Sequence, residues 1–536
     1  MRRRKFLKGL SSAAVVGAAS SSKGASFLGS SSLETKASVS QVAALIGKPD
    51  DRIKHIIVLM LENRSFDHML GYSRIDGVDG VWDKDCSNLD ENGTKVSTSP
   101  NAQTAGDLMV DPGHDFTDVQ IQLFSPNDKN QMPGTDPQMN GFIRSYARYK
   151  DAKSHNIMKC FSPESVPVLT RLAREFVVCN RWFSSIPGPT LPNRLFAHAG
   201  TSQGRLDMSA AEFNISPTIY EVLSHANVSS TIYADGWTAT STFWNLMKYQ
   251  DQYFGTLDDF YQDCYDNQLP GYCFIEPRYS SGIVDGTFRP QNDQHPNSDV
   301  AEGEQLIHDV YKAIRGNRKV WESSIFVVVY DEHGGIYDHV PPPKAVPPGD
   351  PSTPDFGFGF DRYGVRVPAV IVSAYTDHAV LNDVFDHTSL IATARKLLTG
   401  QYQDAALHNR AMQAIPFDKA LNRDRDQGPR KDHVELPAPQ VRRGKHDQQS
   451  LEADLNHLQI MNLKQALLVN GSLPASLQIN PKSVLKKDVT NSSADEEFKG
   501  IQVKNAEHYI QSIQTSARDA KTLIPKDGQP QTGAPK

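Results

Sequence analysis

The chain has 536 residues, of which 38% are hydrophobic and 22% charged, with a formal net charge of −6 at pH 7. Enough apolar side chains are present for a sizeable core, which excludes wholesale disorder. The negative net charge argues against a dedicated nucleic-acid-binding protein, because such proteins carry a basic excess. No apolar run reaches the roughly 18 residues that cross a membrane, so we expect no transmembrane segment.

The N-terminus has the pattern of an export signal. A basic run, Arg2-Arg3-Arg4-Lys5, precedes a short apolar stretch and a series of small residues, which is the arrangement of a secretory signal. Residues 3–8 (RRKFLK) resemble the bacterial twin-arginine (Tat) signal. We therefore expect a Tat-type signal peptide over residues 1–35 and a protein that is periplasmic or secreted. The alternative is an ordinary basic helix.

The cysteines give no metal-binding pattern. The chain has five of them, an odd number without CxxC spacing, at Cys86, Cys160, Cys179, Cys264 and Cys273. This spacing argues against a zinc cluster. In an oxidising compartment Cys160 would pair with Cys179, or Cys264 with Cys273. Free, partly buried thiols are the other interpretation.

Short apolar runs rich in β-branched residues predict strands of a parallel sheet that are buried on both faces. The clearest runs are residues 53–61 and 324–330, with weaker ones at 176–178, 230–233 and 367–373. Helical patterns lie between them, at 166–175, 302–314 and 388–398. This alternation predicts an α/β fold with a mostly parallel central sheet flanked by helices.

Acidic pairs follow the two clearest strands. Glu62 and Asn63 come directly after one, and Asp331 and Glu332 after the other. Ligands of such sheets bind beyond the carboxyl ends of the strands, and carboxylates gathered there repel one another unless a cation lies between them. Oxygen ligands favour Ca²⁺, Mg²⁺ or Mn²⁺ over zinc, so we predict one divalent metal ion. A single Glu-Asn pair is also explained as a cap or turn.

A nucleophile candidate stands at a predicted helix start. Pro187-Gly188-Pro189 breaks the chain before Thr190, which has the position of an N-cap, with Pro192 in the first turn. A helix N-terminus offers unpaired N–H groups and a partial positive charge, which suit a phosphate group and an alkoxide. Taken alone, Thr190 is better explained as a plain cap, and the catalytic interpretation depends on the other motifs.

Three motifs, in this order, resemble the phosphoesterase family: residues 62–68 (ENRSFDH), 187–194 (PGPTLPNR) and 331–342 (DEHGGIYDHVPP). That family holds bacterial phospholipases C, plant non-specific phospholipases C and a branch of bacterial acid phosphatases. The resemblance runs from about residue 52 to 400, so we expect a catalytic domain over residues 50–415. It implies a fold like that of the alkaline phosphatase superfamily, in agreement with the strand pattern.

The resemblance also implies roles for single residues. Glu62, Asn63, Asp331 and Glu332 would surround the metal ion, and Thr190 would be the nucleophile that forms a phospho-enzyme. The acid phosphatase branch typically has Ser at this place, so Thr190 favours the phospholipase branch.

Five histidines remain to be placed. His114 and His295 resemble the family's early and late active-site histidines; one would stabilise phosphoryl oxygens and the other protonate the leaving alcohol. His198, His333 and His339 are expected to be structural.

The expected reaction is hydrolysis of the glycerol-side phosphodiester of phospholipids such as phosphatidylcholine, at a membrane surface. The products would be diacylglycerol and a phosphorylated head group. Two alternatives remain: a broad-specificity acid phosphatase acting on monoesters, and a non-catalytic lipid-binding protein on the same scaffold.

The remaining segments are assigned by composition. Residues 341–364, rich in Pro and Gly, predict a long loop over the carboxyl edge of the sheet. Its aromatic-glycine run, residues 356–360, would contact acyl chains or pack as a surface loop. Residues 416–447 predict a linker or extended arm, and residues 448–536 a helical extension with a disordered end over residues 527–536.

Overall fold

A computed structural model describes most of the chain. It describes residues 49–125, 135–208, 217–236, 238–247, 249–284, 287–350, 355–400, 407–441, 451–452, 454–473, 475–489 and 495–523. The signal peptide expected over residues 1–35 and the end expected to be disordered lie outside the described residues.

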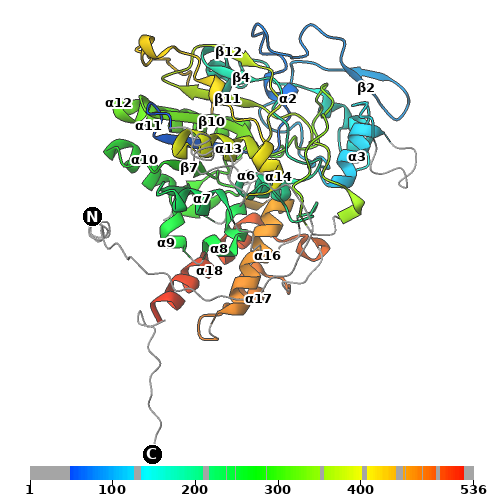
Figure 1. Ribbon diagram of the computed structural model, residues 1–536. Coiled ribbons are helices and arrows are strands. Elements are labelled where there is room, and N and C mark those ends of the chain that lie inside the picture. The colour runs from blue at the N-terminus through cyan, green and yellow to red at the C-terminus, as the bar shows by residue number, and fades with distance from the viewer. Residues whose placement is uncertain are drawn as a thin grey trace, which may run out of the picture. The chain divides into compact units, whose positions relative to one another are not determined.

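The core is an eight-stranded sheet in the order β12-β4-β11-β10-β1-β7-β5-β6 (Figure 1). Its strands are β1 (His55–Leu61), β4 (Val177–Cys179), β5 (Ser230–Tyr233), β6 (Phe254–Gly255), β7 (Tyr272–Ile275), β10 (Ser324–Tyr330), β11 (Ala369–Ser373) and β12 (Ala379–Leu381). Strand β11 is antiparallel to both of its neighbours, and the other pairs are parallel. The predicted mostly parallel α/β fold is therefore confirmed. Two small antiparallel pairs are β2 (Ser87–Leu89) with β3 (Lys95–Ser97), and β8 (Gly282–Val284) with β9 (Thr287–Arg289).

The two central strands, β1 and β10, set the position of the acidic pairs. Every residue of β10 is buried, and so is every residue of β1 except His55. Their parallel register pairs Leu61 with Tyr330. Because both strands end at this pair, the acidic residues that follow them leave the sheet side by side, as the sequence pattern predicts.

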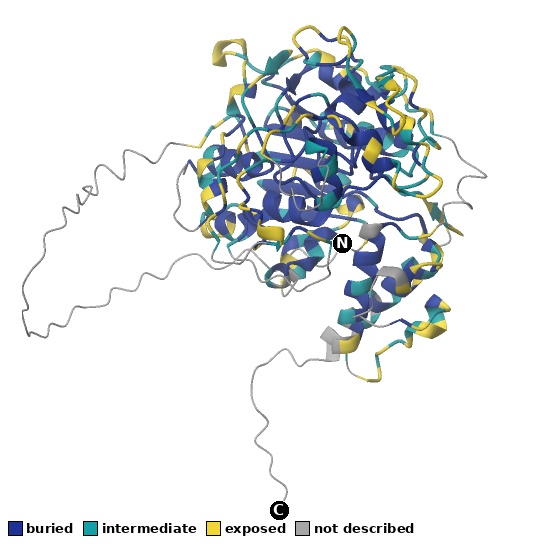
Figure 2. Cartoon of the chain, turned by 90° about the vertical axis from the view of Figure 1, so that its right-hand side faces the viewer, coloured by how far each residue is buried: buried dark blue, intermediate teal, exposed yellow. Residues whose placement is uncertain are grey.

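Helices surround the sheet, and Figure 2 shows the buried residues concentrated in the sheet and the helices packed on it. The α-helices are α2 (Phe66–Leu70), α3 (Phe116–Phe124), α4 (Phe142–Tyr146), α5 (Pro167–Glu175), α6 (Thr190–Ala199), α7 (Ile219–His225), α8 (Trp244–Met247), α9 (Gln250–Tyr253), α10 (Leu257–Asp266), α11 (Val300–Gly316), α12 (Arg318–Trp321), α13 (Thr388–Ala394), α14 (Asn409–Gln413), α16 (His457–Ser472), α17 (Pro481–Leu485) and α18 (Val503–Leu523). Short 3₁₀ turns are η2 (Ser154–Met158), η3 (Ala239–Thr242), η4 (Asp355–Gly357), η6 (Asp418–Ala420), η7 (Arg425–Gln427) and η8 (Asp495–Phe498). Helix α13 continues into the π-helical turn η5 (Arg395–Thr399). None of the described helices is long and apolar enough to cross a membrane.

The segments after the sheet pack closely. Of the segment predicted as a linker or arm, residues 416–441 are described, and Phe417, Ala420 and Val434 are buried in the main core. Helices α16, α17 and α18 share a separate apolar cluster. Gln459 of α16 donates a hydrogen bond to the backbone oxygen of Tyr279 (2.8 Å).

The cysteines are free thiols, and neither of the two pairings considered from the sequence is present. Cys86 is half-buried and the other four are buried.

A buried arginine ties α2 to the loop after β10. Arg366 pairs with Asp67 of α2 (2.8 Å) and with Asp338 (3.1 Å), and all three side chains are fully buried. Burial raises the pKa of Asp338 to about 6, although Arg366 counteracts that shift. This network holds the segment after Asn63 against the segment after Glu332.

We expect Arg366→Met to lower the free energy of unfolding by about 3–5 kcal/mol, because it leaves two buried carboxylates without their cation. Arg425→Met is the control: Arg425 pairs with Asp50 and Asp51, and its side chain is 59% exposed, so the free energy of unfolding should change little. Urea unfolding of both variants measures the difference. Equal losses would show that the buried network does not hold the loops.

Candidate active site

The structure brings the predicted nucleophile to the predicted metal ligands. The Thr190 hydroxyl lies 3.0 Å from Asn63 Oδ1 and 3.4 Å from Glu62 Oε2. Asp331 Oδ1 accepts hydrogen bonds from the backbone N–H groups of Asn63 (3.0 Å) and Glu332 (2.7 Å). All five residues are buried at the carboxyl edge of β1 and β10.

Helix α6 begins one residue earlier than predicted. Thr190 is its first residue, and Pro189 in an extended conformation takes the cap position. The Thr190 side chain is therefore aimed at Asn63 and does not cap the helix. Asn193 fixes the preceding loop: its Oδ1 accepts from Ile186 N (3.0 Å) and its Nδ2 donates to Gly188 O (2.9 Å).

Carboxylates crowd this edge, and the crowding changes their acidity. Burial and the charge of Asp331 raise the pKa of Glu62 and of Glu332 well above the usual range. Glu332 Oε2 accepts from Gly334 N (2.7 Å). Among the described residues Glu332 Oε1 has no hydrogen-bond donor, and it lies 3.9 Å from His114 Nδ1.

A fixed cation, Arg194 of α6, lies among these carboxylates. It contacts Glu62 (2.8 Å), Glu276 (3.0 Å) and Asp331 (3.1 Å), and all four side chains are fully buried. No role for Arg194 or Glu276 was predicted from the sequence. Glu276 directly follows β7, and the run Tyr272–Ile275 was not predicted as a strand, so the signal of an acid after a strand was missed.

The two predicted active-site histidines face each other. The ring centroids of His114 and His295 are 6.1 Å apart. His295 Nδ1 bonds Asn297 Oδ1 (2.9 Å), and its Nε2 lies 3.6 Å from Asp111 Oδ2. Burial lowers the pKa of His295, although the nearby Asp293 counteracts it.

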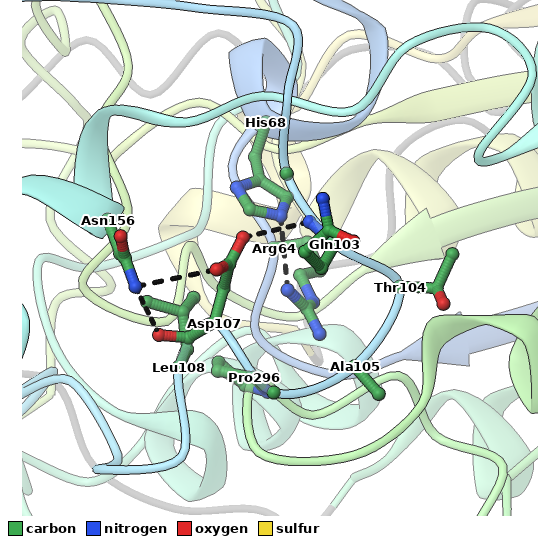
Figure 3. Close-up of a pocket in the computed structure, with 11 residues that line it drawn as sticks. Arg64, His68, Gln103, Thr104, Ala105, Asp107, Leu108, Asn156 and Pro296 are labelled. Atoms are coloured by element: carbon green, nitrogen blue, oxygen red, sulfur yellow. Dashed lines mark hydrogen bonds between the residues drawn. The ribbon is translucent and has the colours of Figure 1, made fainter.

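Arg64 supports the His295 segment from behind. Its Nε donates to Gln294 O (2.7 Å) and its Nη2 to His295 O (3.1 Å), while Nη1 contacts His68 Nε2 (3.1 Å). Figure 3 shows the small pocket beside this arginine, with Pro296 in its wall. The pocket thus lies behind the histidine segment, and Glu62, Asp331 and Glu332 do not line it.

The histidines expected to be structural each contact protein groups. His333 Nε2 meets Gln122 Oε1 (2.7 Å), and burial lowers the pKa of His333 to about 3. His198 Nδ1 lies 3.0 Å from the hydroxyl of Tyr220. His339 Nδ1 lies 2.6 Å from Asp67.

A further histidine, His387, was not predicted from the sequence. The indole N–H of Trp182 donates to its Nδ1 (3.3 Å). Because an indole nitrogen only donates, the ring proton of a neutral His387 sits on Nε2, which is 2.5 Å from the backbone oxygen of Asp331. His387 therefore anchors the end of β10. It lies far along the chain from each motif, so no local pattern marks it.

Two glycines let the three loops meet. Gly334 has φ +63°, and a Cβ there would lie 2.2 Å from the backbone oxygen of Asn63. Gly335 has φ +69°, and its Cβ would lie 2.5 Å from the backbone oxygen of Gly113, next to His114. Asn63 itself has φ +54°, a conformation that non-glycine residues rarely adopt. The turn after Glu332 therefore packs directly on the loops of Asn63 and His114.

Two groups of acidic residues are candidates for a metal ion. Ligand atoms of Asp67, Asp338 and His339 lie within 4.8 Å of one another, but both carboxylates of this group already pair with Arg366. At the other group, Arg194 contacts Glu62 and Asp331, whereas Glu332 Oε1 has no donor among the described residues. The excess negative charge and the oxygen donors of this second group, with Asn63 and Thr190, fit a hard divalent cation.

Comparison with known proteins shows the family to which the chain belongs. The model of the phosphoesterase family matches residues 53–398. The chain is 34% identical to non-specific phospholipase C3 of Arabidopsis thaliana, over 79% of this chain and 84% of that protein. It is 36% identical to non-specific phospholipase C1 of the same plant (64% and 67%) and 28% identical to phospholipase C B of Mycobacterium tuberculosis (64% and 73%).

Solved structures that are similar to the chain include an alkaline phosphatase superfamily protein from Vibrio parahaemolyticus (12% identity, TM-score 0.28, covering 46% of this chain and 62% of that one). Another is the lipoteichoic acid synthase LtaP from Listeria monocytogenes (10% identity, TM-score 0.33, covering 70% and 77%). The family match spans most of the chain and includes all three motifs, so the protein belongs to the phosphoesterase family.

We expect Gly334→Ala to reduce turnover about 100-fold, because displacing Asn63 by about 1 Å misplaces the groups around Thr190. Gly428→Ala is the matched control: Gly428 has φ +64° and no described atom within 4 Å of its Cβ position. Because Gly428 combines φ +64° with ψ −169°, a region that is essentially restricted to glycine, the control should show only a backbone cost of about 1–3 kcal/mol, seen as a lower melting temperature with unchanged turnover. Equal effects on turnover would refute the packing role of Gly334.

Proposed function

We propose that the protein is an exported phospholipase C that hydrolyses the glycerol-side phosphodiester of phospholipids such as phosphatidylcholine. The observation that carries the proposal is the Thr190 hydroxyl, buried at the start of α6 and 3.0 Å from Asn63 Oδ1, beside Glu62. The names of the relatives and the Thr in place of the Ser that is typical of acid phosphatases favour a diester over a monoester substrate.

The reaction proceeds in two displacements at phosphorus. Thr190 Oγ1 attacks in line, the bond from phosphorus to the glycerol oxygen breaks, and diacylglycerol leaves. Glu62 Oε2, 3.4 Å from the hydroxyl, is within reach of its proton. His114 and His295 protonate the leaving oxygen and contact the phosphoryl oxygens. Water then hydrolyses the bond between Thr190 and phosphorus and releases the phosphorylated head group.

Glu62, Asn63, Asp331 and Glu332 would hold one divalent metal ion together with the Thr190 oxygen. Such an ion offsets the charge that develops on phosphoryl oxygens and favours the alkoxide of the nucleophile. The donors are oxygens, so Ca²⁺, Mg²⁺ or Mn²⁺ is favoured. Arg194 limits the repulsion among the ligands and keeps them in place.

Export follows from the Tat-type signal over residues 1–35 and places the enzyme in the periplasm or outside the cell. The proposed catalytic domain spans residues 50–415. Residues 416–447 lead from it to the C-terminal helices, and Phe417, Ala420 and Val434 of this segment pack in the main core. The enzyme acts on its substrate at a membrane surface.

Thr190→Ala should lose more than 1,000-fold of the phosphatidylcholine-hydrolysing activity, because no other group forms the covalent bond. Thr170→Ala is the control: this threonine is buried in α5, and its hydroxyl has no hydrogen-bond partner among the described residues, so activity should be unchanged. Diacylglycerol and phosphocholine are measured separately. If the wild type hydrolyses only p-nitrophenyl phosphate, the protein is an acid phosphatase. If it binds lipid without hydrolysing either substrate, it is a non-catalytic lipid-binding protein. Full activity of Thr190→Ala would show that Thr190 is not the nucleophile.

Asp331→Asn should reduce the bound divalent metal from one ion per chain to none after dialysis, because it removes a charge that the cation needs. His339→Gln should keep the ion, since both carboxylates beside His339 already pair with Arg366. Metal analysis and calorimetric titration with Ca²⁺, Mg²⁺ and Mn²⁺ measure both variants. Loss of the ion in His339→Gln alone would move the metal site to that group.

A further inference from the structure

We infer that the loop of residues 355–360 (DFGFGF) is the element that contacts the phospholipid surface, with the Phe356 side chain entering the apolar layer. The inference rests on the proposed function and adds the part of the molecule that meets the lipid. Phe356 of this loop stacks on Phe116, which lies two residues after His114 of the candidate active site.

Phe356 is exposed although the aromatic side chains around it are buried. Its exposed fraction is 62%, whereas Phe116, Phe358 and Phe360 are 5% exposed or less. The Phe356 ring stacks on Phe116, with centroids 5.4 Å apart and an interplanar angle of 19°. Phe116 in turn contacts Phe358 (5.2 Å). One face of Phe356 is thus supported by the core.

Phe356 has a strained backbone conformation. Its φ of +53° is rare for a bulky residue, and such strain persists only where the surroundings impose it. Asp355 anchors the turn: its N–H donates to Gly204 O (3.1 Å) and its Oδ2 accepts from Leu206 N (3.2 Å). The exposed ring is therefore presented by a fixed turn.

The loop is continuous with the candidate active site. Two rings of the loop, Phe358 and Phe360, share an apolar cluster with Phe116, Ile186, Phe196 and Leu206, and Phe356 stacks on Phe116 of this cluster. Phe116 begins α3, two residues after His114, and Ile186 lies four residues before Thr190. When the phosphate of a phospholipid reaches Thr190, its acyl chains lie nearby. An apolar loop next to the segments of His114 and Thr190 is therefore placed to contact these chains.

A lipid surface fits this element better than water does. An aromatic ring gains free energy when its exposed apolar area leaves water, and aromatic side chains favour the membrane interface. Met109, 67% exposed, lies five residues before His114. Exposed apolar side chains therefore occur both on the segment that carries His114 and on the loop stacked against it.

The first test measures binding to phosphatidylcholine vesicles by sedimentation. Phe356→Ser should bind about tenfold more weakly, because less apolar area is buried. The control is Tyr265→Ser, because Tyr265 is 79% exposed. Its backbone oxygen accepts a hydrogen bond from Asn317 (3.0 Å), a residue that precedes β10 in the chain, whereas the candidate active site follows β10. This variant should bind as the wild type does. Binding of Phe356→Ser within twofold of the wild type would overturn the inference.

A second variant guards against a folding defect. Phe356→Trp keeps a large ring, and its fluorescence should be quenched by vesicles with brominated acyl chains more strongly than that of the wild type. Tyr265→Trp should show no added quenching. Equal quenching in the wild type and both variants would overturn the inference, because the ring then stays outside the apolar layer.

Activity separates this inference from the proposed function. On a short-chain phosphatidylcholine below its micelle concentration, Phe356→Ser should match the wild type, whereas on vesicles it should be about tenfold slower at low lipid concentration. An equal loss on both substrates would overturn the surface role. If the wild type hydrolyses no phosphodiester, the proposed function fails, while vesicle binding and quenching still decide the role of the loop.

Discussion

The contact of Arg194 with three buried carboxylates is the constraint on which the site depends. Glu62, Glu276 and Asp331 follow three neighbouring strands of the sheet, and Arg194 stands on the helix that Thr190 begins. Three buried carboxylates without a cation would cost several kcal/mol each. One guanidinium therefore fixes the distance from the nucleophile's helix to the edge of the sheet. Glu276 is itself held by the hydroxyl of Thr240 (2.7 Å).

This arrangement leaves an excess of negative charge next to the nucleophile. Arg194 offsets one charge, while burial still raises the pKa of Glu62 and of Glu332 well above the usual range. A divalent cation would satisfy the remaining charge and favour the Thr190 alkoxide at the same time. The same buried carboxylates that repel one another without a cation would therefore hold the cation that assists phosphoryl transfer.

The sequence predicted the parts of the site that follow long strands. The runs ending at Leu61 and Tyr330 are apolar over the last six residues of seven-residue strands, and the register confirms that the polar pairs after them leave the sheet together. The strand β7 was not predicted, so Glu276, which follows it, was missed. The antiparallel direction of β11 was equally invisible, because a fully buried strand has the same apolar pattern in either direction.

Long-range contacts limited the prediction of single residues. His387 reaches Asp331, and Arg366 reaches Asp67, across long stretches of chain, and no local spacing records such contacts. The start of α6 differed by one residue, because extended Pro189 takes the cap position and frees the Thr190 hydroxyl. That shift changes how Thr190 is understood, since its oxygen points to Asn63 and Glu62 rather than back to its own helix.

The stereochemical course at phosphorus distinguishes a Thr190 phospho-enzyme from direct attack by water. A phosphatidylcholine analogue that is isotopically chiral at phosphorus would be hydrolysed by the wild-type enzyme, and the configuration of the released phosphocholine determined. Attack by Thr190 followed by attack of water gives two inversions, so we expect overall retention. Overall inversion would contradict this mechanism, because water would then displace diacylglycerol directly and Thr190 would not be the nucleophile.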